Sequence, residues 1–141
     1  MEIKESNYAS TDKLVSDLLE KHIVAVGKAI PAYEKKEIAF TAYDDNGAVL
    51  GAVVGEIVWN HLHVSLLGID QTMRKQGVGQ KLLQHIEEYA KQFGARMVIL
   101  ETMSWQAPKF YQKNGYQIFG TVENHPIEGE CKYYLSKVLP S

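Results

Sequence analysis

The stretch Arg74-Lys75-Gln76-Gly77-Val78-Gly79 lies between an apolar, strand-like segment and an amphipathic, helix-like segment. The first turn of a helix leaves about four backbone N–H groups without intrahelical partners and carries roughly half a positive charge, so it can bind an anion. Glycine lacks the Cβ atom that would hold a phosphate away from the backbone. We therefore expect a pyrophosphate over Gly77 and Gly79, with a charged donor from Arg74 or Lys75.

The glycine pattern alone does not identify the ligand that contains this pyrophosphate. A dinucleotide-binding loop has a third glycine where this chain has Leu82, and a Walker loop continues with Lys and Ser or Thr where this chain has Gln80. An ordinary glycine-containing turn between a strand and a helix is the other interpretation. The segments on either side must decide between them.

The flanking segments predict a strand, helix, strand unit. Residues 61–70 are β-branched and apolar enough for a strand, and the helix after the loop ends at Gly94. Residues 96–101 contain the continuous apolar run of a buried parallel strand. Because such a crossover is right-handed, the two strands should be parallel neighbours. One face of the predicted helix carries its apolar residues, which are Leu82, Leu83, Ile86, Tyr89, Ala90 and Phe93.

The part of the chain before this unit predicts a helix and three strands. A short strand is expected at residues 2–6, and the helix after it should begin at Ser10 or Thr11 and end near Gly27. Apolar residues recur at helical spacing within it, namely Leu14, Val15, Leu18 and Leu19. Strands over residues 37–43 and 48–59 should pair through a turn at Asn46-Gly47, the strongest short hairpin signal.

The part after the unit predicts a short helix over residues 107–114 and an antiparallel pair of strands over residues 116–123 and 131–138. The predicted fold class is α/β, with a mixed, twisted sheet of about seven strands and helices on both faces. The expected core residues are Ile38, Phe40, Val53, Leu67, Leu82, Ile86, Val98 and Leu100.

Composition limits the classes of function. The 141 residues suffice for a single domain over 1–141 with a true core, and a net charge of −2 gives no electrostatic signature of nucleic-acid binding. Cys131 is the only cysteine, so there is no internal disulfide framework and no metal-binding constellation. Without an apolar run near 20 residues or the apolar core of a signal peptide, the sequence predicts a cytoplasmic protein with no membrane or nucleic-acid partner.

Three segments in one order resemble a known family. They are the strand Leu66-Leu67-Gly68-Ile69, the loop Arg74-x-x-Gly77-x-Gly79, and the stretch Gln106-Ala107-Pro108-Lys109-Phe110-Tyr111-Gln112-Lys113-Asn114-Gly115-Tyr116. Together they resemble the GNAT superfamily of N-acetyltransferases. The first two match its acetyl-CoA motif, and the third is similar to the motif around its frequent catalytic tyrosine. The resemblance covers residues 48–138 well and residues 7–36 only in being helical.

The resemblance implies that acetyl-CoA is the co-substrate and that no metal is needed. The pyrophosphate would rest on the amides of residues 76–81, and the pantetheine arm would pair with the strand before the loop, where the sheet is splayed between its fourth and fifth strands. Many members have an asparagine that contacts the coenzyme where this chain has Ser104. The expected coenzyme-binding residues are Leu67, Gly68, Ile69, Arg74, Lys75, Gln76, Gly77, Val78, Gly79, Gln80, Lys81 and Ser104.

The resemblance also implies the reaction, in which a primary amine attacks the thioester directly and the coenzyme thiolate leaves. Tyr111 would protonate the thiolate, because a phenol with a pKa of about 10 keeps its proton at neutral pH. A base must deprotonate the ammonium form of the amine. Strict alternation puts His61, His63, Ser65, Leu67 and Ile69 on one strand face. Glu101 and His63 are the preferred candidates for the base, ahead of Glu56 and His61.

The acceptor would be a primary amine of a small molecule or a peptide, and the sequence does not name it. The resemblance allows a homodimer. Two other functions fit the same motifs. One is a catalytically silent sensor or regulatory module that binds coenzyme A without turnover, and the other is a regulator that binds ATP or NAD through the glycine loop.

Overall fold

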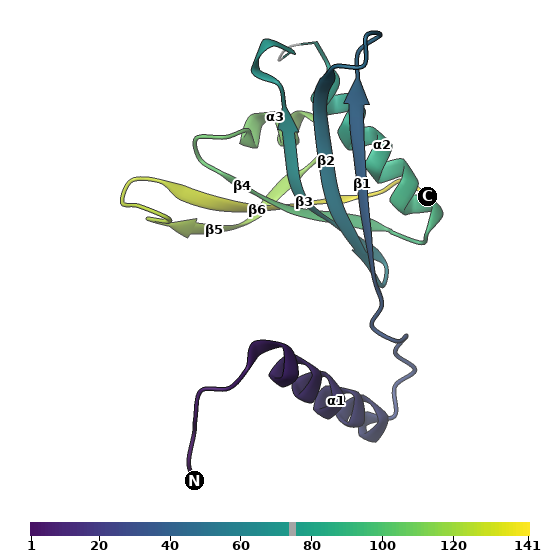
Figure 1. The fold of residues 1–141 in the computed structure, drawn as a ribbon, viewed down its shortest axis with the longest axis vertical. Coiled ribbons are helices and arrows are strands. Elements are labelled where there is room, and N and C mark those ends of the chain that lie inside the picture. The colour runs from purple at the N-terminus through teal and green to yellow at the C-terminus, as the bar shows by residue number, and fades with distance from the viewer. Residues whose placement is uncertain (74–75) are drawn as a thin grey trace. The chain divides into compact units, whose positions relative to one another are not determined.

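The computed structural model describes residues 1–73 and 76–141, which form two compact units, residues 1–32 and residues 33–141 (Figure 1). The first unit contains the helix α1, Tyr8–Val26. The predicted helix is confirmed, but its N-cap is Asn7, whose side chain accepts a hydrogen bond from the Ser10 N–H at 3.0 Å. Gly27 ends the helix in the left-handed conformation. The strand predicted for residues 2–6 is wrong, since these residues form no strand.

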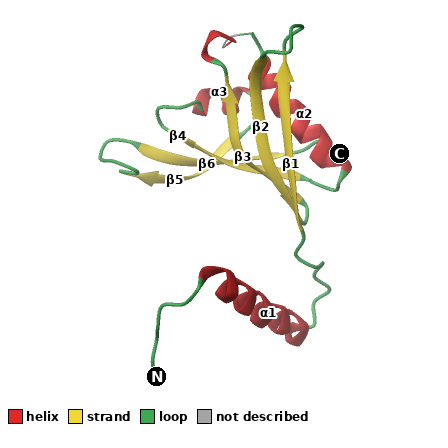
Figure 2. Ribbon diagram, in the orientation of Figure 1, coloured by secondary structure: helices red, strands yellow, loops and turns green. Residues whose placement is uncertain are grey.

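The second unit contains the sheet and the two remaining α-helices (Figure 2). Its elements are β1 (Lys35–Tyr43), β2 (Val49–Val58), β3 (His61–Ile69), the 3-10 helix η1 (Gln71–Met73), α2 (Val78–Gln92), β4 (Met97–Met103), α3 (Pro108–Lys113), β5 (Gln117–Glu123) and β6 (Cys131–Val138). Every strand predicted after residue 36 is present. The described sheet therefore has six strands instead of about seven, because the first predicted strand does not form.

The strand order is β1-β2-β3-β4-β6-β5, and only β3 and β4 are parallel among the described pairs. This confirms the parallel neighbours expected on either side of α2. Their register begins at His61 opposite Met97 and ends at Val64 opposite Leu100. Beyond that point both strands continue, β3 to Ile69 and β4 to Met103.

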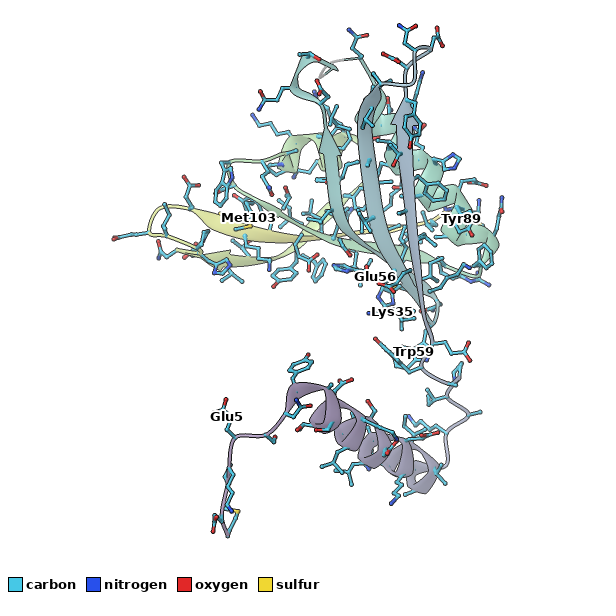
Figure 3. All side chains as sticks on the ribbon, in the orientation of Figure 1. Glu5, Lys35, Glu56, Trp59, Tyr89 and Met103 are labelled. Atoms are coloured by element: carbon cyan, nitrogen blue, oxygen red, sulfur yellow. The ribbon has the colours of Figure 1, made fainter. Side chains whose placement is uncertain are left out.

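The core lies between the sheet and the apolar face of α2, where Leu83 and Ile86 are fully buried. Full burial of one such side chain stabilises the folded state by roughly 1.5–3 kcal/mol relative to leaving it exposed. Tyr89 also lies on this face, with its ring centroid 5.2 Å from that of Phe40 on β1 (Figure 3). Six of the eight predicted core residues are buried, and Phe40 and Leu67 are partly buried against them.

α3 contributes Tyr111 to the same core as α2. That helices cover both faces of the sheet stays a prediction. That residues 1–141 form a single domain likewise stays a prediction. No helix within residues 1–73 and 76–141 has both the length and the apolar character that a membrane span requires.

A β-bulge in β3 changes which side chains face the core. Val54 pairs with Leu66 whereas Gly55 pairs with Val64, so Ser65 is the extra residue. The expected alternation is wrong for this reason. Leu67 and Ile69 pack against the core, whereas Ser65 contacts the carboxylate of Glu56 and the half-buried His63 contacts that of Glu101.

Candidate active site

A cavity of about 960 Å³ opens where the pairing of β3 with β4 ends. This volume lies at the upper end of the range of roughly 300–1,000 Å³ that is usual for small-molecule sites. Three regions line it: β3 from Val64 onward, the first turn of α2, and the segment from Glu101 on β4 through α3. The lining residues include Leu67, Gly68, Ile69, Gly77, Val78, Gly79, Gln80, Glu101 and Tyr111, which were all predicted as site residues.

The first turn of α2 presents main-chain atoms to the cavity. Gly77 is the N-cap and has a φ of +78°, which disfavours any residue with a side chain. α2 has no side-chain cap and no acidic residue in this turn, so nothing in the described turn competes with an anion for its amides. A Cβ atom on Gly79 would lie 3.3 Å from Cζ of Phe110, so a side chain there would be crowded.

Four predicted coenzyme-binding residues near this turn are either outside the described residues or do not line the cavity. Arg74 and Lys75 lie outside the described residues. Gln76 and Lys81 are exposed and do not line the cavity. The turn therefore offers backbone amides and close approach of an anion, whereas the side chains of Gln76 and Lys81 are not among the lining residues.

The end of β3 presents a strand edge to the cavity. On one side it pairs with β2, where Gly68 lies opposite Ala52. On the other side its register with β4 has already ended at Val64. A Cβ atom on Gly68 would have no described heavy atom within 4 Å, so the backbone is accessible at this position. Such an edge can accept an extended ligand as an additional strand.

Tyr111 lies on α3 with 8% of its surface exposed, and it lines the cavity. Burial raises the pKa of its phenol above the ordinary value of 10.0. Among the described residues, its hydroxyl has no hydrogen-bond partner. The side chain is thus a protonated donor at neutral pH, and it is available to a molecule in the cavity.

Tyr111 packs against a buried hydrogen-bonded network of side chains. Tyr116 packs edge-on against it with ring centroids 5.7 Å apart. The Tyr116 hydroxyl donates to Oε2 of the buried Glu87 at 2.5 Å, and Lys137 Nζ donates to Oε1 of the same carboxylate at 2.9 Å. Burial and the Glu87 charge raise the pKa of Tyr116. Because both carboxylate oxygens are engaged, the Tyr116 ring is held in one place against Tyr111.

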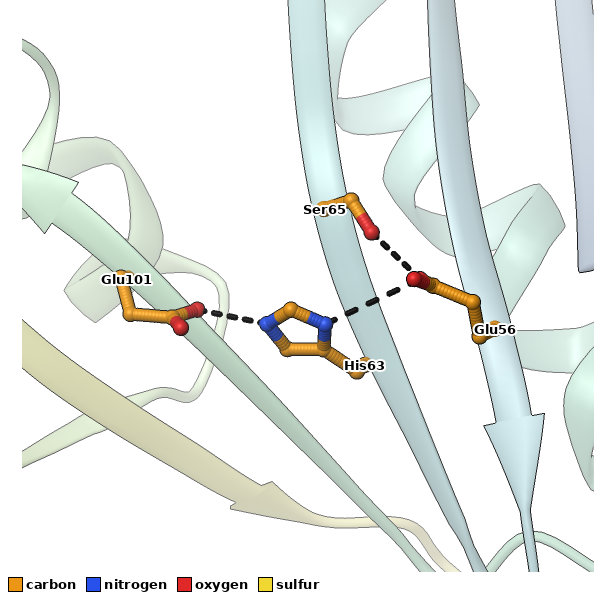
Figure 4. Close-up of polar contacts among 4 residues, drawn as sticks. All are labelled: Glu56, His63, Ser65 and Glu101. Carbon is orange, nitrogen blue, oxygen red and sulfur yellow. Dashed lines mark hydrogen bonds and ion pairs between the residues drawn. The ribbon is translucent and has the colours of Figure 1, made fainter. Parts of the chain in front are cut away.

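Next to Glu101, which lines the cavity, His63 lies between two carboxylates (Figure 4). Its Nε2 is 2.7 Å from Oε2 of Glu101, and its Nδ1 is 3.7 Å from Oε2 of Glu56. Ser65 donates a hydrogen bond to the same Glu56 oxygen. Each of the three ionisable side chains is about a third exposed or less. Three of the four candidate bases thus come together, and His61 takes no part in these contacts.

Ser104 lies outside the cavity lining. Its hydroxyl donates to Glu130 and accepts the Cys131 N–H at 3.0 Å, so it joins the end of β4 to the start of β6. Gln106 lines the cavity instead and accepts the Met103 N–H at 2.9 Å. Sequence reasoning missed both Gln106 and Ser65 as lining residues, because a loop and a bulge place them there and neither has a local sequence signal.

Metal binding has no support within the described part of the chain. There, no group of three or more His, Cys, Asp or Glu side chains is arranged to hold a metal ion. The polar side chains that line the cavity include Ser65, Glu101 and Tyr111, which are groups suited to proton transfer.

Comparison with known proteins identifies the family, since the model of the acetyltransferase (GNAT) family matches residues 9–116. The chain belongs to this family. It is 36% identical over 99 residues to blasticidin-S acetyltransferase from Streptomyces morookaense, covering 70% of this chain and 72% of the relative. This GNAT chain is therefore an acyltransferase, and the resemblance seen in its sequence is confirmed.

Solved structures support the same fold for this GNAT acetyltransferase. An acetyltransferase from Bacillus cereus matches with a TM-score of 0.84 and 29% identity, over 99% of this chain and 98% of that one. A Bacillus anthracis protein crystallised with acetyl coenzyme A matches with a TM-score of 0.65 and 24% identity, over 79% of this chain and 65% of that one. The second likeness concerns the fold alone.

Proposed function

We propose that this GNAT acetyltransferase moves an acetyl group from acetyl-CoA to a primary amine of a small molecule or peptide, by direct attack of the amine on the thioester. One observation carries the proposal: the first turn of α2, the β3 edge, Tyr111 and Glu101 all line one cavity. One bound molecule of acetyl-CoA would thus contact its binding groups on α2 and β3, and its thioester would lie near the acid Tyr111 and near Glu101, the partner of His63.

The coenzyme would bind mainly through backbone atoms. The diphosphate would rest on the amides that follow Gly77, where the open first turn of α2 favours an anion. The pantetheine arm would run along Leu67, Gly68 and Ile69, beyond the point where the pairing of β3 with β4 ends. Arg74, Lys75, Gln76 and Lys81 would assist from the loop and the helix surface. A role for Ser104 would require its hydroxyl to leave Glu130.

Tyr111 would act as the general acid. Its raised pKa keeps the phenol protonated, and its hydroxyl is available to donate to the coenzyme sulfur as the thiolate leaves. The strand amide near Leu67 would stabilise the oxyanion that develops on the thioester carbonyl, an interaction that is typically worth about 2.7–4 kcal/mol.

His63 would be the final acceptor of the amine proton, with Glu101 as its partner. An ionised Glu101 can only accept, so the 2.7 Å contact places the hydrogen of a neutral ring on Nε2. When the ring gains a second proton, Glu101 and Glu56 each lie close enough to stabilise the imidazolium. This role supports direct attack, because the amine must become neutral before it can attack the thioester.

The relative blasticidin-S acetyltransferase is named for the acetylation of blasticidin S, which supports the inclusion of such compounds among the acceptors to be tested. The test is a panel of small-molecule and peptide amines, assayed for acetyl-CoA-dependent release of free thiol. We expect release with at least one amine and none without the protein. Titrations of acetyl-CoA, ATP and NAD against thermal stability accompany it, since only a ligand of the native state raises the melting temperature. Stabilisation by ATP or NAD but not by acetyl-CoA would refute the proposal.

A further inference from the structure

The His63 cluster faces the cavity through two residues only among those described, Ser65 and Glu101 (Figure 4). His63 and Glu56 are absent from the lining, so Ser65 and Glu101 are the two side chains of this cluster that connect the cavity to His63. Glu101 does not serve as this route in the proposal, because its contact is with Nε2, the nitrogen that would carry the hydrogen of a neutral ring next to an ionised carboxylate. The vacant position is Nδ1, on the side of Glu56.

We infer that Ser65 and Glu56 form a proton relay from the cavity to Nδ1 of His63. This inference rests on the proposed N-acetyltransferase function and adds two residues to it. Ser65 lines the cavity and its Oγ donates to Glu56 Oε2, and that same oxygen lies 3.7 Å from Nδ1. The three groups therefore form a continuous line of proton donors and acceptors from the cavity to the ring.

Each transfer in the relay is balanced. The N–H bond of the ammonium breaks as Ser65 Oγ takes its proton, and the original Ser65 proton passes to Glu56 Oε2. The O–H bond formed on Glu56 then breaks as Nδ1 of His63 takes the proton. The amine keeps its lone pair, Ser65 ends as a hydroxyl, and the ring ends as an imidazolium between two carboxylates. The last transfer needs Glu56 and the ring to approach by about 0.5–1 Å, since hydrogen bonds between N and O span about 2.7–3.2 Å.

The β-bulge explains why Ser65 can take this position. As the extra residue between the pairs Gly55–Val64 and Val54–Leu66, it is not opposite any residue of β2. A bulge re-aims a side chain relative to strict alternation. Ser65 can consequently line the cavity and still reach Glu56 on the neighbouring strand.

The test compares Ser65→Ala, Glu56→Gln and the double variant in the thiol-release assay. We expect each single variant to lower kcat by at least about tenfold, as loss of one part of an acid–base pathway does. The KM for acetyl-CoA should stay within about twofold of the wild-type value, and the double variant should be no slower than the slower single variant, because both residues serve one pathway. Ser65→Thr, which keeps the hydroxyl, should restore most of the rate.

A matched control is Glu37→Gln on β1. Glu37 lies directly opposite Glu56 in the register and has no contact with His63 among the described residues, so its kcat should match the wild type. Ser65→Ala with wild-type kcat, losses that multiply in the double variant, or a Ser65→Thr variant as slow as Ser65→Ala would overturn the relay while acetyl transfer itself stands. If the wild type releases no thiol with any amine, the proposed function fails instead.

Discussion

The two ends of the cavity are built from different kinds of atoms. The proposed coenzyme end consists of main-chain groups from two stretches that are close in sequence, residues 67–69 and 77–80, where glycine keeps the backbone accessible. The proposed base end consists of side chains from three strands, with Glu56 on β2, His63 and Ser65 on β3, and Glu101 on β4, and of these Ser65 and Glu101 line the cavity. The first end should therefore be sensitive to an added Cβ atom, and the second to a changed functional group.

The largest expected effect is at the base end. His63→Gln should lower kcat by about a hundredfold or more, because the ring is the final proton acceptor and general-base groups contribute about that much. Coenzyme affinity, measured by calorimetry, should be unchanged, because the binding atoms belong to the other end. His85→Gln on the exposed side of α2 is the matched control and should keep the wild-type rate. A His63→Gln variant with normal kcat, or one that loses coenzyme affinity, would remove the distinction between the two ends.

Tyr111→Phe comes next, with a loss in kcat of roughly tenfold to a hundredfold from the missing acid. The packing against Tyr116 is kept in this variant, so the melting temperature should change little. Tyr43→Phe on the exposed edge of β1 serves as the control. Unchanged kcat in Tyr111→Phe would show that another group protonates the leaving thiolate.

A smaller effect is expected from Gly77→Ala at the coenzyme end. The left-handed conformation costs about 1–2 kcal/mol for a residue with a side chain, so the turn should relax and coenzyme affinity should fall by roughly tenfold. Gly94→Ala, at the other end of α2 and also at positive φ, is a matched control for backbone strain. It should lower stability without changing the Kd for the coenzyme. Equal Kd changes in both variants would argue against a diphosphate at this turn.

The smallest expected effect concerns pH. Since burial disfavours the phenolate and raises the pKa of Tyr111 above 10.0, its proton is retained as the pH rises toward that value. The activity that depends on Tyr111 should thus persist from about pH 8 to about pH 10 and decline only above it. The measurement is the pH profile of kcat for the wild type and Tyr111→Phe. An alkaline decline below pH 10 that is present only in the wild type would contradict the raised pKa.

The same contrast explains what could be predicted from the sequence. Residues 61–101 carry periodic apolar patterns and glycine signals, so the crossover, the parallel pair and the turn at Gly77 could be predicted from local rules. Tyr111 was found only because its segment resembles a family motif. The strand at residues 2–6 was predicted on a pattern too short to be decisive, and Asn7 was missed as the cap although asparagine is a preferred one.

The base end could be predicted only in part, because its geometry depends on pairings between distant residues. Glu101 and His63 were candidates, but their contact depends on the parallel register of β3 with β4. Ser65 lines the cavity because of a bulge, and no residue pattern in β3 predicts that bulge. Ser104 shows that a motif position does not fix the partners of a side chain, since its hydroxyl bonds to Glu130 and Cys131, and its role in coenzyme binding stays a prediction.

The most direct test is a crystal structure of the protein with coenzyme A. We predict that the diphosphate lies on the backbone amides that follow Gly77 and that the Tyr111 hydroxyl lies within hydrogen-bond distance of the coenzyme sulfur. Coenzyme bound elsewhere, or bound at this turn with its sulfur out of reach of Tyr111, would contradict the proposed acetyl transfer.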